Sequence, residues 1–116
     1  MTPDPQEFTR EWIEAWNAHD LPSVLSHYTE DFEMSSPYIA QFIGEPSGML
    51  KGKEQVAAYW AVGLQKLPDL HFELIKTYAG ATSIAIHYHG AKGKTVIEVF
   101  HFAPDGRVNR AAAHYD

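Results

Sequence analysis

The sequence predicts an α+β fold, in which a cone-shaped, curved antiparallel sheet wraps around three N-terminal helices. Helical patterns fill the first half of the chain, and four stretches of strand character follow at 70–78, 83–89, 94–102 and 107–115. The turns "GAKGK" and "APDG" join neighbouring strands, so we expect an antiparallel meander. The sheet must curl around the helices to bury them, which leaves a mouth where a small molecule could enter.

The first helix is predicted from a capping box and an apolar stripe. Asp4, Pro5 and Glu7 fit the N-cap, N1 and N3 positions, where a carboxylate, a proline and a glutamate each stabilise a helix start. Apolar side chains then recur at helical spacing. These side chains are Phe8, Trp12, Ile13 and Trp16.

The rest of the front half is predicted to contain two more helices, a strand and a long loop. Asp20 fits the N-cap of a helix "LPSVLSHY", which runs through Tyr28, and "DFEMSSP" then alternates as a short strand. Residues 37–52 contain three glycines and two prolines but are rich in apolar side chains, so we expect a loop that closes over a ligand. The third helix is expected at about 53–66.

Composition limits the classes of function. The 116 residues fit one domain, 1–116, and the net charge of −6 argues against nucleic acid or an anionic membrane as the main partner. The absence of cysteine excludes disulfides, thiolate catalysis and cysteine-based zinc sites. The polar start "MTPDPQEFTREW" has no secretory pattern and no apolar run approaches 18 residues, so a cytoplasmic location is expected.

Three segments carry a resemblance to a known family. "EWIEAWNAHDLPSVLSHYTEDFEM", "GKEQVAAYWAVGL" and "VIEVFHFAPDGRV" are similar to the nuclear transport factor 2-like superfamily, in its SnoaL-like and ketosteroid isomerase-like branch. The resemblance covers nearly the whole chain. It implies the cone-shaped nuclear transport factor 2-like (cystatin-like) fold and a homodimer that forms through the sheet. Members of the branch include isomerases, dehydratases, epoxide hydrolases, polyketide cyclases and non-catalytic binders, so the fold leaves the reaction open.

Ketosteroid isomerases use a general-base Asp, a Tyr that stabilises the oxyanion, and a protonated Asp. By resemblance, the base position is Ser36 here, the oxyanion Tyr is Trp12, and a supporting Tyr is Trp60. Tyr28 retains one partner Tyr, and Glu98 stands at the protonated-acid position. Because the base and the main donor are replaced, we do not expect steroid isomerisation by that mechanism.

Limonene epoxide hydrolases, which the chain also resembles, have a catalytic Asp on the last strand. They also have an Arg two residues before the acid that corresponds to Glu98. These positions are Ala113 and Val96 here. The epoxide hydrolase mechanism is therefore not expected either.

Glu98 is the predicted catalytic residue. It lies within "VIEVFHF", where alternation places Val96, Glu98, Phe100 and Phe102 on one face. If this face lines the cone, desolvation raises the pKa of the carboxyl group, which could then donate a hydrogen bond or transfer a proton. The alternatives are a glutamate on a solvated face, or one satisfied structurally by the indole N–H groups of Trp12 or Trp60.

The predicted ligand is a small apolar molecule, bound without a cofactor. The sequence has no glycine-rich phosphate loop, metal motif or covalent triad that would indicate one. The predicted activity is acid/base chemistry of the isomerase, dehydratase or cyclase type. The alternative is a non-catalytic small-molecule binder or a homodimeric interaction domain, in which the same aromatic side chains are core residues. The predicted ligand contacts are Trp12, Tyr28, Met34, Ser36, Tyr38, Phe42, Trp60, Val96, Phe100 and Tyr115.

Four histidines on the meander have two interpretations. His101 and His114 face away from Glu98, and His87 and His89 share a face that could join them. The group could form a metal site, but no carboxylate or "H-x-x-x-H" spacing supports one, so we predict no metal and place the histidines at a dimer interface. Such a dimer is expected to loosen below about pH 6, where histidines become charged.

Overall fold

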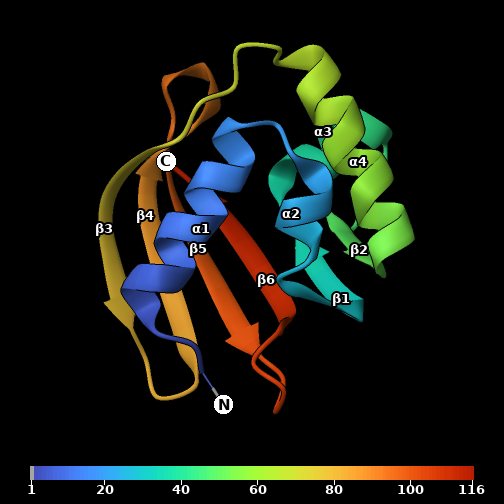
Figure 1. Cartoon of the computed structure of the whole chain (residues 1–116). Helices are drawn as coiled ribbons and strands as arrows, with labels where there is room; N and C mark the ends of the chain where they lie inside the picture. The colour runs from blue at the N-terminus through green and yellow to red at the C-terminus, as the bar shows by residue number, and fades with distance from the viewer. Residues whose placement is uncertain (1) are drawn as a thin grey trace.

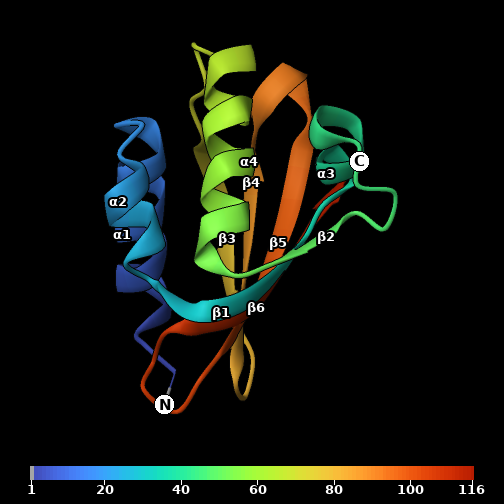
Figure 2. The same cartoon turned by 90° about the vertical axis from the view of Figure 1, so that its right-hand side faces the viewer.

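The computed structural model describes residues 2–116 and shows a six-stranded sheet that curves around four helices (Figures 1 and 2). The strands are ordered β2-β1-β6-β5-β4-β3 across the sheet. The α-helices are α1 Pro5–Asn17, α2 Leu21–Leu25, α3 Pro37–Ile43 and α4 Lys53–Lys66, and a short 3₁₀ helix, η1, spans Ala91–Gly93. The strands are β1 Tyr28–Ser35, β2 Met49–Lys51, β3 Glu73–Ala79, β4 Ser83–His89, β5 Thr95–Phe102 and β6 Val108–Tyr115.

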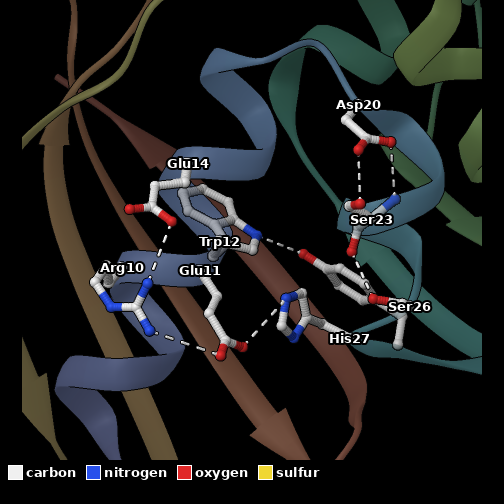
Figure 3. Close-up of polar contacts among 9 residues, drawn as sticks. Arg10, Glu11, Trp12, Glu14, Asp20, Ser23, Ser26 and His27 are labelled. Atoms are coloured by element: carbon white, nitrogen blue, oxygen red, sulfur yellow. Dashed lines mark hydrogen bonds and ion pairs between the residues drawn. The ribbon is translucent and has the colours of Figure 1, made fainter.

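Two predicted helix starts are confirmed by their cap hydrogen bonds. The backbone N–H of Glu7 donates to the Asp4 carboxylate at 2.9 Å, which starts α1. Asp20 accepts from the backbone N–H and the hydroxyl of Ser23 and starts α2 (Figure 3). Each cap satisfies an N–H group that has no partner within its helix. The helix predicted at about 53–66 is also present, as α4.

The prediction that the second helix runs through Tyr28 is wrong. Helix α2 ends at Leu25, and Tyr28 is the first residue of β1, where it lies opposite Val108 of β6. The Tyr28 side chain is completely buried, so its position in the apolar pattern reflects the core face of a strand and not of a helix. Strand β1 therefore begins three residues before the predicted "DFEMSSP" strand.

The prediction of a loop over residues 37–52 is also wrong. Ser36 caps a helix by accepting a hydrogen bond from the backbone N–H of Tyr38, and Pro37 occupies the first turn of α3. Gly44 ends α3 in the left-handed conformation, with φ of 75°, which glycine adopts without strain. The serine–proline pair that ends β1 is thus also a helix start. Strand β2 follows and pairs with β1, so much of the segment is regular structure.

The sheet is larger than the predicted four-stranded meander and is mixed rather than purely antiparallel. Strands β3 to β6 form the antiparallel meander, but β1 pairs in parallel with β6 and carries β2 at the edge. The strand at 83–89 has its predicted bounds, whereas β3 begins at Glu73 and not at residue 70. The two added strands extend the sheet so that it bends around α4 (Figure 2).

Aromatic side chains between α1 and the sheet form much of the core. Trp12 is 1% exposed; its ring stacks on Phe72 and meets the edges of Tyr88 and Phe100. These rings bury a large apolar area at low conformational cost, which fixes α1 against the sheet. Within residues 2–116, no helix combines the length and apolar character needed to cross a bilayer.

The histidines of the meander lie on the face of the sheet that points away from Glu98 and the helices. The strand register arranges them in rows. His87, Ile97 and His114 are opposite one another on β4, β5 and β6, and they form one row. His101 pairs with Arg110 in another row. The part of the chain that the structure describes contains no group of three or more metal-ligating side chains.

Candidate functional site

An apolar cavity lies between the helices and the inner face of the sheet. Its volume is about 70 Å³. Helices α1, α3 and α4 and strands β1, β4, β5 and β6 all contribute to its wall. The lining side chains and glycines are Trp12, Trp16, Met34, Ser36, Tyr38, Phe42, Tyr59, Trp60, Gly63, Leu64, Leu67, Leu70, Phe72, Tyr88, Gly90, Ala91, Val96, Glu98, Ala113 and Tyr115.

Glu98 provides the only carboxyl group among the described residues of this lining. It is 4% exposed, and burial raises its pKa to about 7, against an ordinary value of 4.5. The Tyr88 hydroxyl donates a 2.8 Å hydrogen bond to Oε1 of Glu98, which moderates the rise. A carboxyl group with a pKa near neutrality can both give and take a proton under physiological conditions.

Tyrosine hydroxyls surround the glutamate. Burial raises the pKa of Tyr28, Tyr88 and Tyr115 well above the usual range and that of Tyr59 to about 12, and the nearby Glu98 adds to the rise in each case. These hydroxyls therefore stay protonated at any physiological pH and act as hydrogen-bond donors. Tyr59, Tyr88 and Tyr115 line the cavity, whereas Tyr28 does not. Donors in the lining stabilise negative charge that develops on a ligand oxygen.

The Ser36 hydroxyl serves the protein itself. It caps α3 and lies 3.5 Å from the Tyr59 hydroxyl, which donates to it. Within the described residues around it, the lining offers no histidine or lysine that could activate the serine as a nucleophile. Ser36 can hydrogen-bond a ligand, but it cannot replace a general base.

Trp12 and Trp16 differ in their hydrogen bonds. The indole N–H of Trp12, which is labelled in Figure 3, donates to the Tyr28 hydroxyl at 2.9 Å, so this donor is already used inside the protein. The indole N–H of Trp16 is buried and has no acceptor within residues 2–116. Glu98 accepts from Tyr88 and not from a tryptophan, so the alternative of a structural pair with Trp12 or Trp60 is not what the structure shows.

The structure brings together all but two of the predicted site residues. Tyr28 and Phe100 are completely buried and stand outside the cavity lining, whereas Glu98 and the other predicted contacts are part of it. Ala113 lies opposite Glu98 in the strand register and also lines the cavity, where its methyl group provides no acid/base function.

Sequence reasoning missed two polar members of the lining, Tyr59 and Tyr88, and favoured a core role for a third, Trp16. The alternation of Ile84, Ile86 and Tyr88 on β4 was a usable signal, because all three side chains are buried on the inner face. The sequence offered no comparable signal for the hydrogen-bonding state of Trp16.

Helix α3 contributes two aromatic side chains to the cavity wall. Tyr38 and Phe42 are half-buried and stack on each other, and Tyr38 also meets the edge of Tyr115. The ammonium group of Lys92 lies 5.7 Å from the centres of both α3 rings, and that of Lys66 lies 5.7 Å from Phe42. These cation–π contacts help to hold the two rings in place.

The cavity volume limits what fits without rearrangement. An engineered apolar cavity of roughly 150 Å³ accommodates benzene, which is about twice the volume here. A ligand with a ring therefore requires lining side chains to move. Tyr38, Phe42 and Tyr115 are among the half-buried side chains of the lining, which have solvent beside them.

Comparison with known proteins identifies the family. Residues 9–111 match the model of the SnoaL-like domain. The chain belongs to the SnoaL-like family. Over 97% of its length this SnoaL-like chain is 61% identical to a SnoaL-like protein of unknown function from Burkholderia thailandensis, of which it covers 99%, with a TM-score of 0.92. No protein with curated annotation matches the SnoaL-like chain.

More distant structures share the fold. A putative SnoaL-like isomerase from Agrobacterium tumefaciens is 16% identical, with 96% of each chain covered and a TM-score of 0.75. A putative polyketide cyclase from Sinorhizobium meliloti is 11% identical, with 93% of this chain and 94% of that chain covered and a TM-score of 0.73. TerC, crystallised with polyporic acid, is 12% identical, with 96% of this chain and 90% of the TerC chain covered and a TM-score of 0.76. At these identities the likeness shows a shared fold alone.

Proposed function

We propose that this protein catalyses cofactor-free proton transfer on a small apolar molecule bound in the cavity, with Glu98 as the acid/base group. The observation that carries the proposal is a single buried carboxyl group with a pKa of about 7 in an otherwise apolar, aromatic cavity. The Agrobacterium and Sinorhizobium structures, described as a putative isomerase and a putative polyketide cyclase, agree with this reaction class.

The chemistry follows from the polar groups on the wall. When Glu98 is ionised, it removes a proton from a carbon next to a ligand carbonyl group, and the electron pair of the C–H bond moves toward the carbonyl oxygen. A tyrosine hydroxyl in the wall donates a hydrogen bond to that oxygen as its charge grows. The protonated Glu98 then returns a proton to the same carbon or another one. The net result is exchange or isomerisation, with no change in oxidation state.

Exchange of the α-protons of cyclopentanone in D2O tests this reaction without knowledge of the natural substrate. We expect the protein to accelerate deuterium incorporation, measured by proton NMR, and we expect Glu98→Gln to lose roughly 10²- to 10⁴-fold of that acceleration. Gln keeps the shape and can still accept from Tyr88, but it cannot transfer a proton. Since the ionised form is the base, the rate is expected to rise with pH through about 7.

Glu14→Gln is the matched control, because its side chain is 66% exposed on α1 and forms only a surface pair with Arg10. It is expected to keep the full exchange rate. Equal rates for the parent protein and Glu98→Gln would refute the role of Glu98. An absence of acceleration in the parent protein would refute proton transfer on this ketone.

A second candidate is a non-catalytic binder. The observation that favours it is the lack of a second carboxyl group among the described lining residues. By resemblance, Ser36 and Ala113 stand where related enzymes have acids. In that case the protein binds cyclopentanone without exchanging its protons, and Glu98→Gln changes affinity alone.

We also propose a homodimer through the outer face of the sheet. Ile97 is 43% exposed there between His87 and His114, and an apolar side chain in such a row suits burial against a second copy. Histidines become charged as the pH falls below about 6, and the charged rows then repel across the interface. Sedimentation is expected to show a smaller dimer fraction at pH 5.5 than at pH 7.5. The same fraction at both values would remove the histidines from this role.

A further inference from the structure

We propose that the indole N–H of Trp16 donates a hydrogen bond to the ligand, and that the ligand is a neutral carbonyl compound whose oxygen accepts this hydrogen bond. This inference rests on the cavity being the ligand site, as proposed above, but it concerns recognition and not proton transfer. It assigns a binding residue that the family resemblance does not provide.

The unsatisfied donor is the first observation. Trp16 is 6% exposed, and its Nε1 is the only buried side-chain nitrogen or oxygen without a partner within residues 2–116. Buried polar groups in folded proteins almost always have a hydrogen-bond partner, because leaving one unpaired costs free energy. A donor kept at this cost is explained when a bound molecule supplies the acceptor.

The three aromatic rings that pack against Trp16 supply no acceptor for its N–H. Its ring contacts Trp60 edge-on at 5.0 Å, Trp12 edge-on at 6.3 Å and Phe72 at 5.6 Å between ring centres. Two of these rings are indoles, whose N–H groups are donors only, and the third has no polar atom. The cavity, which the Trp16 ring lines, is therefore the place from which an acceptor can come.

The charge of the wall defines the ligand class. The described lining contains one carboxyl group and no lysine, arginine or histidine, so a buried anion would have no counter-charge and would be repelled by ionised Glu98. The lining otherwise consists of aromatic and aliphatic side chains and tyrosine hydroxyls. A compact, neutral, apolar molecule with a carbonyl oxygen satisfies these conditions.

The test observes the donor directly by NMR. In a ¹⁵N-labelled protein the three indole N–H groups give three signals, and Trp16→Phe identifies that of Trp16 by its loss. Cyclopentanone is expected to shift the Trp16 indole proton downfield, as a new hydrogen bond does, whereas cyclopentane, which has the same ring but no acceptor, is expected to leave it in place. Trp16→Phe is expected to weaken cyclopentanone binding roughly three- to tenfold and to leave cyclopentane binding unchanged.

Trp12→Phe is the matched variant, because it makes the same change on the same helix but removes an N–H that already donates to Tyr28. It is expected to lower the unfolding midpoint more than Trp16→Phe does and to reduce the preference for ketone over hydrocarbon less.

Three results would overturn the assignment. The first is a Trp16 signal that stays fixed while other cavity signals respond to cyclopentanone. The second is a Trp16 N–H that contacts a bound water which the ketone does not displace. The third is a protein in which neither probe shifts any cavity signal. A Trp16 shift without α-proton exchange would refute the catalytic proposal alone and leave this assignment in place.

Discussion

The free energy of unfolding of Glu98→Gln, relative to that of the parent protein, is expected to increase by roughly 2 to 3 kcal/mol as the pH rises from 5 to 8. The pKa of Glu98 is about 7 in the folded protein, against an ordinary value of 4.5, because the carboxylate is buried. Between these two values the folded state holds a proton that the unfolded state has lost. The free energy of unfolding of the parent protein therefore falls as the pH rises through this range, and above about 7 the full cost of a buried charge is present.

The difference between the two proteins isolates this effect. Other groups also titrate; burial lowers the pKa of His27, for example, which removes stability at the acidic end in both proteins alike. Urea unfolding of both proteins at pH 5, 6, 7 and 8 gives the difference at each pH. Parallel curves would show that Glu98 titrates in the folded protein as it does in the unfolded chain, which contradicts its buried position.

Phe100→Ala is expected to lower the free energy of unfolding by about 3 to 5 kcal/mol. The Phe100 side chain is completely buried, and its ring meets the edges of Phe8 at 5.1 Å and Trp12 at 5.2 Å between ring centres. Its removal leaves a hole between α1 and the sheet that these large rings cannot fill without leaving their own contacts. The free energy of unfolding of a domain of this size is about 5 to 15 kcal/mol in total, so the loss brings the variant close to the point where it no longer folds.

Ile97→Ala on the same strand is the control. Ile97 is 43% exposed on the opposite face, so the truncation removes β-propensity and little packing. We expect a loss of less than about 1 kcal/mol in urea unfolding at low protein concentration. Similar losses for Phe100→Ala and Ile97→Ala would contradict the assignment of the two faces of β5.

The parts of the fold that depend on local signals could be predicted from the sequence. The caps at Asp4 and Asp20 and the periodicity of residues 53–66 depend on neighbours three or four positions away. Helix α3 was missed because Ser36–Pro37 ends a strand and starts a helix at once. The pairing of β1 with β6 was missed because the two strands are distant in the chain and no short turn indicates their contact.

Some features of the candidate site could also be predicted from local sequence signals, and others could not. Strand alternation was enough to place Glu98 on the inner face, and the structure confirms that it is buried there with Val96. Its hydrogen bond to Tyr88 requires the register between β4 and β5, which the sequence does not specify. The unsatisfied N–H of Trp16 is a property of everything around it, so no pattern within α1 could have indicated it.

The position of β6 in the sheet has a consequence for biosynthesis. Strand β6 lies between β1 and β5, so residues 108–115 join an N-terminal pair of strands to the rest of the sheet. Until residues 108–115 have been synthesised, β1 and β5 each have an unpaired edge. The chain between β1 and β5 also cannot yet be closed into a loop by pairing through β6. We expect the domain to stay sensitive to proteases on the ribosome until β6 has emerged, and a chain that stops at residue 107 to aggregate.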